Sequence, residues 1–471
     1  MWQHKKTMTH TETLTNNIIA HADGLPMPRR LYSVIAITLG LFSSMMNSTI
    51  ANVALPTIAQ NLDIAPADSI WIINAYQIAT IIFLLPCSTL GEIYSYKHVL
   101  LIGLSIFTIA SFCCSFSTSF VMLICFRIMQ GLGSAAMVSV NMTLIKLTYP
   151  KRYLSQGIGL NSTFVAISSV AGPAIASAVM SFTTWQWLFA LNVPIGIFAV
   201  IFGFWALPAN QITDTTRPFP KTDALLNALF FGALTMTAEG LMHQFDILIT
   251  TSLALLTIAI AAIYIPKQLR QTTPLLPFDL LRIKIFSISI LTSITSFIAQ
   301  MTAMTAMPFY LQHKLGYNAA EVGILFTAWP CTVMITAPFS GFLIRKIHPG
   351  ILGGIGQMLI IAGLVALALT PPDASKFDVI WRLMLCGAGF GLFQSPNNSV
   401  IIMSAPAERN GSASGMLATS RLLGQATGAM LVALMFNLFD ANGPQYALLT
   451  AACVATVSCL LSVSRIKIQI E

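Results

Sequence analysis

Residues 131–141 read GLGSAAMVSVN, and residues 387–397 read GAGFGLFQSPN. The two stretches share glycine, glycine, serine and asparagine at the same four places, 256 residues apart. The same shift extends the match to a proline and a glycine further on, and a shift of 252 residues aligns a proline and a serine earlier in each stretch. The sequence therefore predicts two similar halves. The aligned pairs are Gly131/Gly387, Gly133/Gly389, Ser139/Ser395, Asn141/Asn397, Pro150/Pro406, Gly159/Gly415, Pro86/Pro338 and Ser88/Ser340.

The composition around these stretches is that of a membrane protein. Of the 471 residues, 56% are hydrophobic and 8% are charged, and the mean hydropathy is +0.77. Soluble domains carry about 25% charged residues, so a water-soluble globule is excluded. Apolar runs of about 20 residues recur along the chain, which is the length that spans a bilayer core of about 30 Å.

Fourteen such runs are expected, arranged as six, two and six. This arrangement predicts a cytoplasmic tail at 1–30 (polar, without the apolar core of a signal peptide), a six-helix bundle at 31–206, linkers and two inserted helices at 207–284, a second bundle at 285–464 and a tail at 465–471. The expected spans are 31–54, 69–90, 98–117, 120–148, 155–180, 186–206, 223–243, 247–265, 285–311, 319–344, 351–370, 379–404, 411–436 and 445–463.

Basic residues alternate sharply between the two sets of loops. One set carries only Lys314 and Lys376, and the other set carries nearly all the remaining basic loop residues. By the positive-inside rule both termini are expected in the cytoplasm, which requires an even number of spans. The net charge of +8 is thereby explained by topology and does not indicate nucleic-acid binding. The basic set is Lys5, Lys6, Arg29, Arg30, Lys97, Lys151, Arg152, Arg217, Lys221, Lys267, Arg270, Arg282, Lys284, Arg345, Lys346, Arg409, Arg465 and Lys467.

The chain offers no sign of enzyme or cofactor chemistry. The eight cysteines lie inside apolar runs, without metal-ligand spacing, and are expected to be packing residues. The phosphate-binding pattern G-x-x-x-x-G-K-[ST] of ATP-driven pumps does not occur. No catalytic residues, metal site or cofactor are therefore expected. Two repeated halves instead suit alternating access, in which they rock about a central site near the bilayer midplane.

A few charged and polar side chains fall at membrane depth. Arg127 is expected to face a wet cavity or a partner, because a charge there costs about 2.5–3.5 kcal/mol on insertion scales. Glu239 is a candidate proton carrier; the alternative is a glutamate at the outer boundary that reaches water or His243. Arg421 is a second candidate cavity or interface charge, and Arg382 is interpreted as a structural anchor. Trp71 and Tyr76 are candidate cavity residues.

Several motifs resemble the fourteen-helix drug:proton antiporter branch of the major facilitator superfamily, particularly its quaternary-ammonium and methyl-viologen pumps. Residues 127–133 (RIMQGLG) resemble its R-x-x-Q-G-x-G, and residues 185–196 (WQWLFALNVPIG) its W-R-W-x-F-x-x-N-x-P-x-G. The run that contains Gly159, Gly172 and Pro173 resembles its antiporter motif, which seals the cavity and marks exporters. The resemblance implies an all-α major facilitator fold of 14 helices, a proton-transfer role for Arg127 beside Gln130, and a cavity role for Asn397.

Two departures from that branch bear on proton coupling. The first helix of the branch usually carries an aspartate where this chain has Asn47, which can hydrogen-bond a substrate but cannot carry a proton. In the loop after the second helix, Glu92 stands where an acidic latch residue is usual, and the arginine that normally follows is absent. Glu239 is therefore the carboxylate expected to take over some of the coupling.

The resulting expectation is a proton-coupled exporter of small amphipathic or cationic compounds in a bacterial inner membrane. Its partners would be a small-molecule substrate, protons and the lipid bilayer, and the protein would be monomeric. One alternative is a dedicated exporter of a single metabolite such as a siderophore. The other is a non-transporting receptor or regulatory homologue, which the altered Asn47 and Glu92 positions favour.

Overall fold

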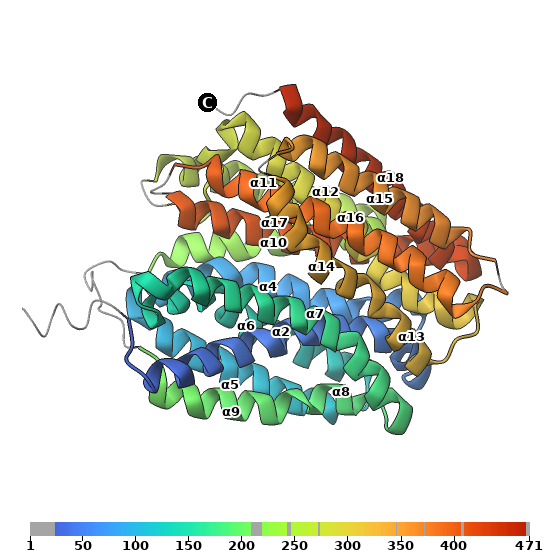
Figure 1. Cartoon of the computed structure of the whole chain (residues 1–471), viewed down its shortest axis with the longest axis horizontal. Coiled ribbons are helices and arrows are strands. Elements are labelled where there is room, and N and C mark those ends of the chain that lie inside the picture. The colour runs from blue at the N-terminus through green and yellow to red at the C-terminus, as the bar shows by residue number, and fades with distance from the viewer. Residues whose placement is uncertain are drawn as a thin grey trace, which may run out of the picture.

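A computed structural model describes residues 24–208, 219–242, 246–271, 274–344, 346–371, 373–406 and 409–467. Within these residues every regular element is a helix (Figure 1). Most of the expected N-terminal tail, the polar linker around Asp214 and Arg217, and His243 lie outside the described residues.

The first half is a bundle in which long helices pack in an interleaved order. Helix α6 lies against α4 and α5, while α2 lies against α7 and α9 (Figure 1). Its elements are α2 (Arg29–Asn61), α3 (Pro66–Ser69), α4 (Trp71–Leu90), η1 (Gly91–Ser95), α5 (Tyr96–Ser115), α6 (Phe120–Thr148), η2 (Lys151–Tyr153), α7 (Leu154–Phe182), α8 (Gln186–Ala190) and α9 (Asn192–Ala206).

The second half repeats this packing. Helix α16 lies against α14 and α15, and α12 lies against α17 and α18. Its elements are α12 (Lys284–Phe309), η4 (Tyr310–Lys314), α13 (Ala319–Phe326), α14 (Ala328–Leu343), α15 (Pro349–Ala368), α16 (Lys376–Met403), α17 (Asn410–Phe439), η6 (Asp440–Asn442), α18 (Gly443–Ser464) and η7 (Arg465–Lys467).

The glycines of the opening sequence match explain why the halves pack alike. A Cβ on Gly131 of α6 would collide with the Tyr76 carbonyl of α4, and one on Gly387 of α16 would collide with the Trp329 carbonyl of α14. Small residues let helix backbones approach closely where no hydrophobic force from water drives association. The repeated glycines therefore mark the same helix–helix crossing in each half.

The halves meet along two seams, one of which is covered by the inserted helices. One seam joins α7 to α13 and α14, and the other joins α4 to α17. Helices α10 (Lys221–Met242) and α11 (Ile247–Arg270) pack on each other, and η3 (Phe278–Arg282) follows them. Because α10 contacts both α4 and α17, it lies over the second seam.

Eleven helical stretches of the described chain are long and apolar enough to cross a membrane. Two of these, Pro66–Ser115 and Ser412–Ser464, each include two long helices. The chain is therefore an all-helical, multi-pass membrane protein. The count of fourteen spans stays a prediction.

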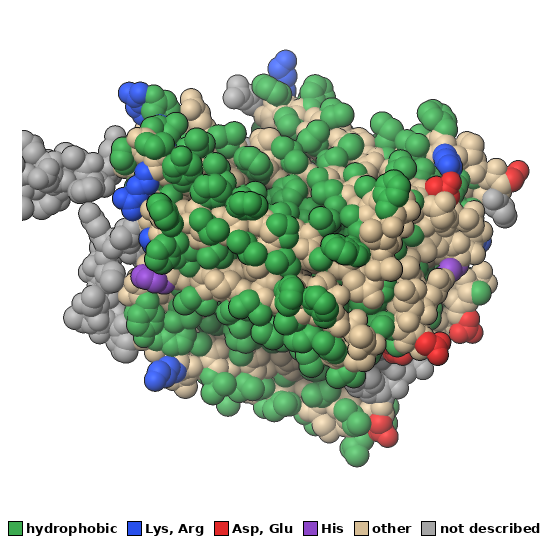
Figure 2. Space-filling view, turned by 90° about the horizontal axis from the view of Figure 1, so that it is seen from below, with side chains coloured by type: hydrophobic (Ala, Val, Ile, Leu, Met, Phe, Trp, Pro, Cys, Tyr) green, Lys and Arg blue, Asp and Glu red, His purple; other side chains and the backbone are tan. Residues whose placement is uncertain are grey.

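Charged side chains gather at the two ends of the bundle. In Figure 2, Lys and Arg side chains concentrate at the left end and Asp and Glu at the right end. At the end that we call the basic end, Arg29 Nε donates to the Ala206 carbonyl at 3.1 Å, and Lys97 Nζ donates to the Phe204 carbonyl at 2.8 Å. These contacts bring the first residues of α2 and α5 to the last residues of α9. At the opposite end, Lys376 pairs with Glu321 at 2.7 Å.

Candidate functional site

Arg127 of α6 is fully buried and is held by neutral partners. Its Nε donates to the Ile72 carbonyl of α4 at 2.7 Å, and its Nη1 donates to Gln130 Oε1 at 2.8 Å. The guanidinium carbon lies 4.5 Å from the centre of the Tyr76 ring. Gln130 Nε2 in turn donates to Ser111 Oγ of α5 at 2.8 Å. Carbonyl oxygens and an aromatic face are the partners that make a buried guanidinium tolerable, so Arg127 ties α4, α5 and α6 together.

Tyr76 adds a hydroxyl cluster to the same half. Its hydroxyl donates to Ser134 Oγ of α6 at 2.7 Å and lies 3.1 Å from Ser44 Oγ of α2. Tyr76 and Gln130 were expected to line the substrate cavity. The structure instead places both inside the packed first half, because their polar atoms are bonded to neighbouring helices.

The other expected cavity residues also lie away from the cavity described below. Asn47 of α2 is fully buried, and neither of its polar side-chain atoms hydrogen-bonds to a described residue. Trp71 packs in an apolar cluster shared by α4, α10 and α17. Asn397 is also buried, since its Oδ1 accepts from Arg465 Nη1 at 2.6 Å and its Nδ2 donates to the Ser289 carbonyl at 3.3 Å.

A cavity of about 210 Å³ lies between the two halves. Helices α2, α6 and α7 of the first half and α12, α16 and α17 of the second half contribute its walls. The polar part of the wall is mostly amide, with one serine and one guanidinium. The lining residues are Leu41, Met45, Val138, Asn141, Asn161, Val165, Phe297, Gln394, Asn398, Ser414, Leu417, Ala418 and Arg421.

The cavity is lined by residues that correspond to one another in the two halves. Several of its lining residues pair under the same 256-residue shift that aligns the two glycine motifs. Positions related by a pseudo-twofold axis face each other only near that axis, and the midplane between repeats is where transporters of this architecture bind substrate. The pairs are Leu41/Phe297, Val138/Gln394, Asn161/Leu417 and Val165/Arg421. Of these wall residues, Arg421 was expected as a candidate cavity charge, whereas the other seven were not, although the 256-residue shift contained the signal for them.

The halves are sealed together at the end opposite the basic end. Thr305 Oγ1 of α12 donates to Asn52 Oδ1 of α2 at 3.2 Å. A Cβ on Gly323 of α13 would lie 2.5 Å from Ser177 Cβ and 2.7 Å from the Pro173 carbonyl, both of α7. A large apolar cluster that includes parts of α2, α12, α13 and α14 surrounds these contacts. Access to the cavity from that end is therefore closed.

The run expected as the antiporter motif contributes to this seal. Gly172 of α7 lies so close to Thr49 of α2 that a Cβ there would overlap the threonine hydroxyl, and Pro173 is buried within α7. Ser177 Oγ donates to the Ala320 carbonyl across the seam. Gly159 lies in the same helix, nearer its basic end. The small residues thus permit close approach within and between the halves.

Glu239 lies where α10 meets α4. Its side chain is fully buried, and its Oε1 accepts a hydrogen bond from Asn74 Nδ2 of α4 at 2.5 Å. Its burial does not fit the alternative in which the carboxylate reaches water, and the other form of that alternative, a contact with His243, lies outside the described residues. Glu92, by contrast, is exposed in η1 between α4 and α5. Neither carboxylate reaches the central cavity.

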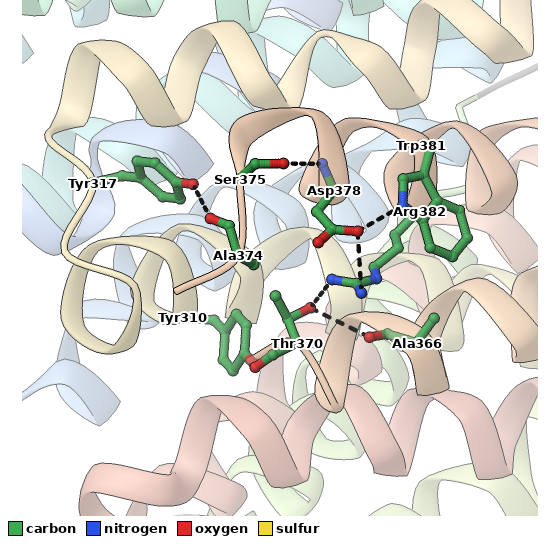
Figure 3. Close-up of polar contacts among 9 residues, drawn as sticks. All are labelled: Tyr310, Tyr317, Ala366, Thr370, Ala374, Ser375, Asp378, Trp381 and Arg382. Carbon is green, nitrogen blue, oxygen red and sulfur yellow. Dashed lines mark hydrogen bonds and ion pairs between the residues drawn. The ribbon is translucent and has the colours of Figure 1, made fainter. Parts of the chain in front are cut away.

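Arg382 is held at the sealed end, as the anchor interpretation expects. Figure 3 shows its guanidinium between Thr370 and Asp378. Its Nη1 donates to Thr370 Oγ1 at 3.0 Å, and its Nη2 lies 3.4 Å from Asp378 Oδ1. Asp378 also accepts from Trp381 Nε1 at 2.9 Å. These contacts join the segment that follows α15 to the first turns of α16, so Arg382 has a structural role at this end of the second half.

Metal-binding groups are not found in this arrangement. The described residues contain no group of three or more His, Cys, Asp and Glu side chains placed to hold a metal ion. The chemistry that the site offers is hydrogen bonding, one positive charge and apolar contact, which suits binding and release of a small molecule.

Comparisons with known proteins agree with this geometry. The chain is 47% identical over 445 residues, covering 94% of this chain and 97% of the relative, to the uncharacterized transporter YebQ of Escherichia coli (strain K12). It is 27% identical over 412 residues (87% and 89%) to the riboflavin transporter RibZ of Clostridioides difficile (strain 630). It is 27% identical over 402 residues (85% and 74%) to the multidrug resistance protein Stp of Mycobacterium tuberculosis (strain CDC 1551 / Oshkosh).

The family is shown by a match over most of the chain. Residues 37–429 match the Major Facilitator Superfamily, whose members are transporters rather than enzymes. This range includes both halves of the cavity wall and the seal at the opposite end. The chain therefore belongs to the Major Facilitator Superfamily and is a multi-pass membrane transporter.

Proposed function

We propose that this protein is a proton-coupled exporter of small amphipathic compounds that works by alternating access. The observation that carries the proposal is the cavity lined by corresponding residues of the two halves, with the seam of Gly323, Ser177 and Thr305 closing the end opposite the basic end. A rocking of the halves that opens this seam and closes the basic end would carry a bound molecule across the membrane.

The proposal includes fourteen spans and a cytoplasmic basic end. In support, Pro66–Ser115 and Ser412–Ser464 each contain two long helices, and α16 (28 residues) is long enough to cross a bilayer of about 30 Å. The basic residues at one end support a cytoplasmic placement of that end under the positive-inside rule. We further propose a bacterial inner-membrane location, a monomer, and bundle boundaries at 31–206 and 285–464.

Glu239 is our proposed proton carrier. Its burial supports this role, because a carboxylate at membrane depth is costly when ionised and must be matched by a partner or neutralised. Its position supports it as well, since α10 lies over the α4–α17 seam, where the two halves move against each other. Protonation of Glu239 would change its hydrogen bond with Asn74 and bias that seam.

Dye accumulation in pump-deficient bacteria tests the proposal. Cells that express the protein should accumulate less rhodamine 123 or fluorescein than cells with an empty vector, and a protonophore should abolish the difference. Glu239→Gln should behave like the empty vector although the protein reaches the membrane. The matched control is Asp68→Asn in α3, which changes an exposed carboxylate at the sealed end and should leave export largely unchanged. Unaltered export by Glu239→Gln would refute its role as proton carrier.

Export of one dedicated metabolite is the second candidate function. The similarity to a protein named as a riboflavin transporter supports it. The same cells separate the two functions, because a broad exporter lowers several unrelated dyes. A dedicated exporter would leave the dyes unchanged and would deplete one cellular metabolite. A non-transporting protein would change neither.

A further inference from the structure

The charge that faces the central cavity is positive and comes from one side chain among the described residues. Among the described residues that line it, Arg421 is the charged one, and none is a carboxylate. Two other arginines in the described chain have acidic partners: Arg382 lies 3.4 Å from Asp378, and Arg409 pairs with Asp279 at 2.9 Å. Arg127 and Arg465 have none among the described residues, but neutral oxygen acceptors take up their hydrogen bonds. The described carboxylates lie elsewhere in the fold, at Asp63, Asp68, Glu92, Asp223, Glu239, Asp246, Asp279, Glu321, Asp373, Asp378 and Asp440.

The guanidinium of Arg421 is unusually poor in partners. Among the described residues, its hydrogen-bond contact is Nη2 to Met45 Sδ at 4.0 Å, a weak acceptor at long range, and its Nε is shielded from solvent without an acceptor. Arg465 in the same half shows the contrast, since it donates to Asn397, Ser289 and Ser462. A guanidinium has five donors, and leaving a desolvated charge without partners is unfavourable.

We propose that the cavity takes a small amphipathic anion, whose carboxylate, sulfonate or phosphate group pairs with Arg421. Guanidinium and such oxyanions match in charge and in fork geometry. The amides of Asn141, Asn161, Gln394 and Asn398 would bind polar groups on the rest of the molecule, and Phe297 and Leu41 would contact its apolar part. This assignment rests on the proposed function, and it narrows the sequence-based expectation of small amphipathic or cationic compounds to amphipathic anions. A cationic substrate would be repelled by the positive charge of Arg421 in the cavity wall.

Binding of two dyes to the purified protein tests this substrate class. Fluorescein is an anion at neutral pH, and rhodamine 123 is a cation on the same xanthene skeleton. Fluorescence anisotropy in detergent should show tighter binding of fluorescein. Arg421→Gln should weaken fluorescein binding at least about tenfold, as expected when a charge-assisted hydrogen bond is lost. Arg152→Gln is the control for net charge, since Arg152 is exposed at the basic end.

A second variant covers the case in which Arg421→Gln does not fold. Gln394→Glu places a carboxylate in the cavity wall on α16 and should invert the preference, so that rhodamine 123 binds more tightly than fluorescein. Tighter binding of rhodamine 123 by the wild type, or unchanged fluorescein binding by Arg421→Gln, would overturn the assignment. Competition by phosphatidylglycerol in nanodiscs, relative to phosphatidylcholine, would also overturn it, because the site would then take a lipid headgroup.

The outcomes separate this inference from the proposed function. Protonophore-sensitive export of rhodamine 123 alone would keep the exporter and reject the anion site. Binding of fluorescein through Arg421 without export of any dye or metabolite would keep the anion site and reject the exporter.

Discussion

The closest packing across the sealed seam gives a prediction with a built-in control. Gly323→Ala would place a methyl group 2.5 Å from Ser177 Cβ and 2.7 Å from the Pro173 carbonyl, which forces α13 and α7 apart. Overpacking of this kind costs about 1–3 kcal/mol. This cost falls only on the conformation in which the seam is closed. The ratio of molecules open at that end to molecules closed there should therefore rise by about 5- to 150-fold.

The control is Gly341→Ala in α14, where an added Cβ meets no atom within 4 Å among the described residues. It should leave the equilibrium unchanged and favour the helix by about 0.5–1 kcal/mol. The assay is the rate at which a bulky maleimide labels Thr305→Cys, a fully buried position in the seal. The exposed Cys125 and Cys453 are replaced by serine beforehand.

The labelling rate reports the open population, because position 305 is reached only when the seam opens. Gly323→Ala should accelerate labelling by the predicted factor, and Gly341→Ala should not. Equal rates for the two variants, or slower labelling in Gly323→Ala, would refute the identification of this seam as the closed gate. A size-exclusion profile that matches the parent protein would show that the variant remains folded.

Two further predictions concern stability and follow from single contacts. Arg127→Lys keeps the charge but loses the stacking on Tyr76 and one of two charged hydrogen bonds. It should lower the free energy of unfolding by about 2–4 kcal/mol and lower the apparent Tm. An unchanged Tm would show that those contacts are not formed. Asn318→Ala removes the capping box with Glu321 at the start of α13 and should cost about 0.5–2 kcal/mol, measured in the same melting experiment. Gly316→Ser, in the loop before α13, is not a suitable control for Asn318→Ala. An added Cβ there would meet open space among the described residues, but the φ of +71° at Gly316 favours glycine, so the substitution would itself be destabilising.

The helical fold and its two-half plan could be predicted from sequence, since both follow from patterns that the chain repeats. Long apolar runs predict helices because a bilayer leaves no water to satisfy backbone groups. Repeated glycines predict matched helix crossings, and Gly131 and Gly387 make equivalent close contacts in the two halves. The sequence also indicated that Arg127 needs a cavity or a partner at membrane depth, but it did not indicate that Gln130 is that partner and is packed away from the cavity.

The cavity wall was harder to predict, because lining a cavity depends on which face of each helix turns inward. Tyr76 and Asn397 carry polar groups suited to a substrate, yet those groups are taken up by Ser134 and by Arg465. Arg421 was identified as a charge at depth, but only the structure places it beside the amides of the opposite half. Glu239 likewise gained a specific partner, Asn74, from a helix far away in sequence.

Uptake into proteoliposomes driven by a proton gradient is the direct test of exchange of substrate against protons. Liposomes that contain the purified protein are prepared with a lumen more acidic than the outside medium, and fluorescein that enters the lumen is collected by filtration. Exchange against protons predicts accumulation above that of protein-free liposomes, its loss when nigericin collapses the gradient, and its absence with Glu239→Gln. Passive entry of a weak acid would deplete the acidic lumen instead, so accumulation has to be active. Equal content of fluorescein, and of rhodamine 123 in a parallel run, with and without the gradient would contradict proton-coupled export.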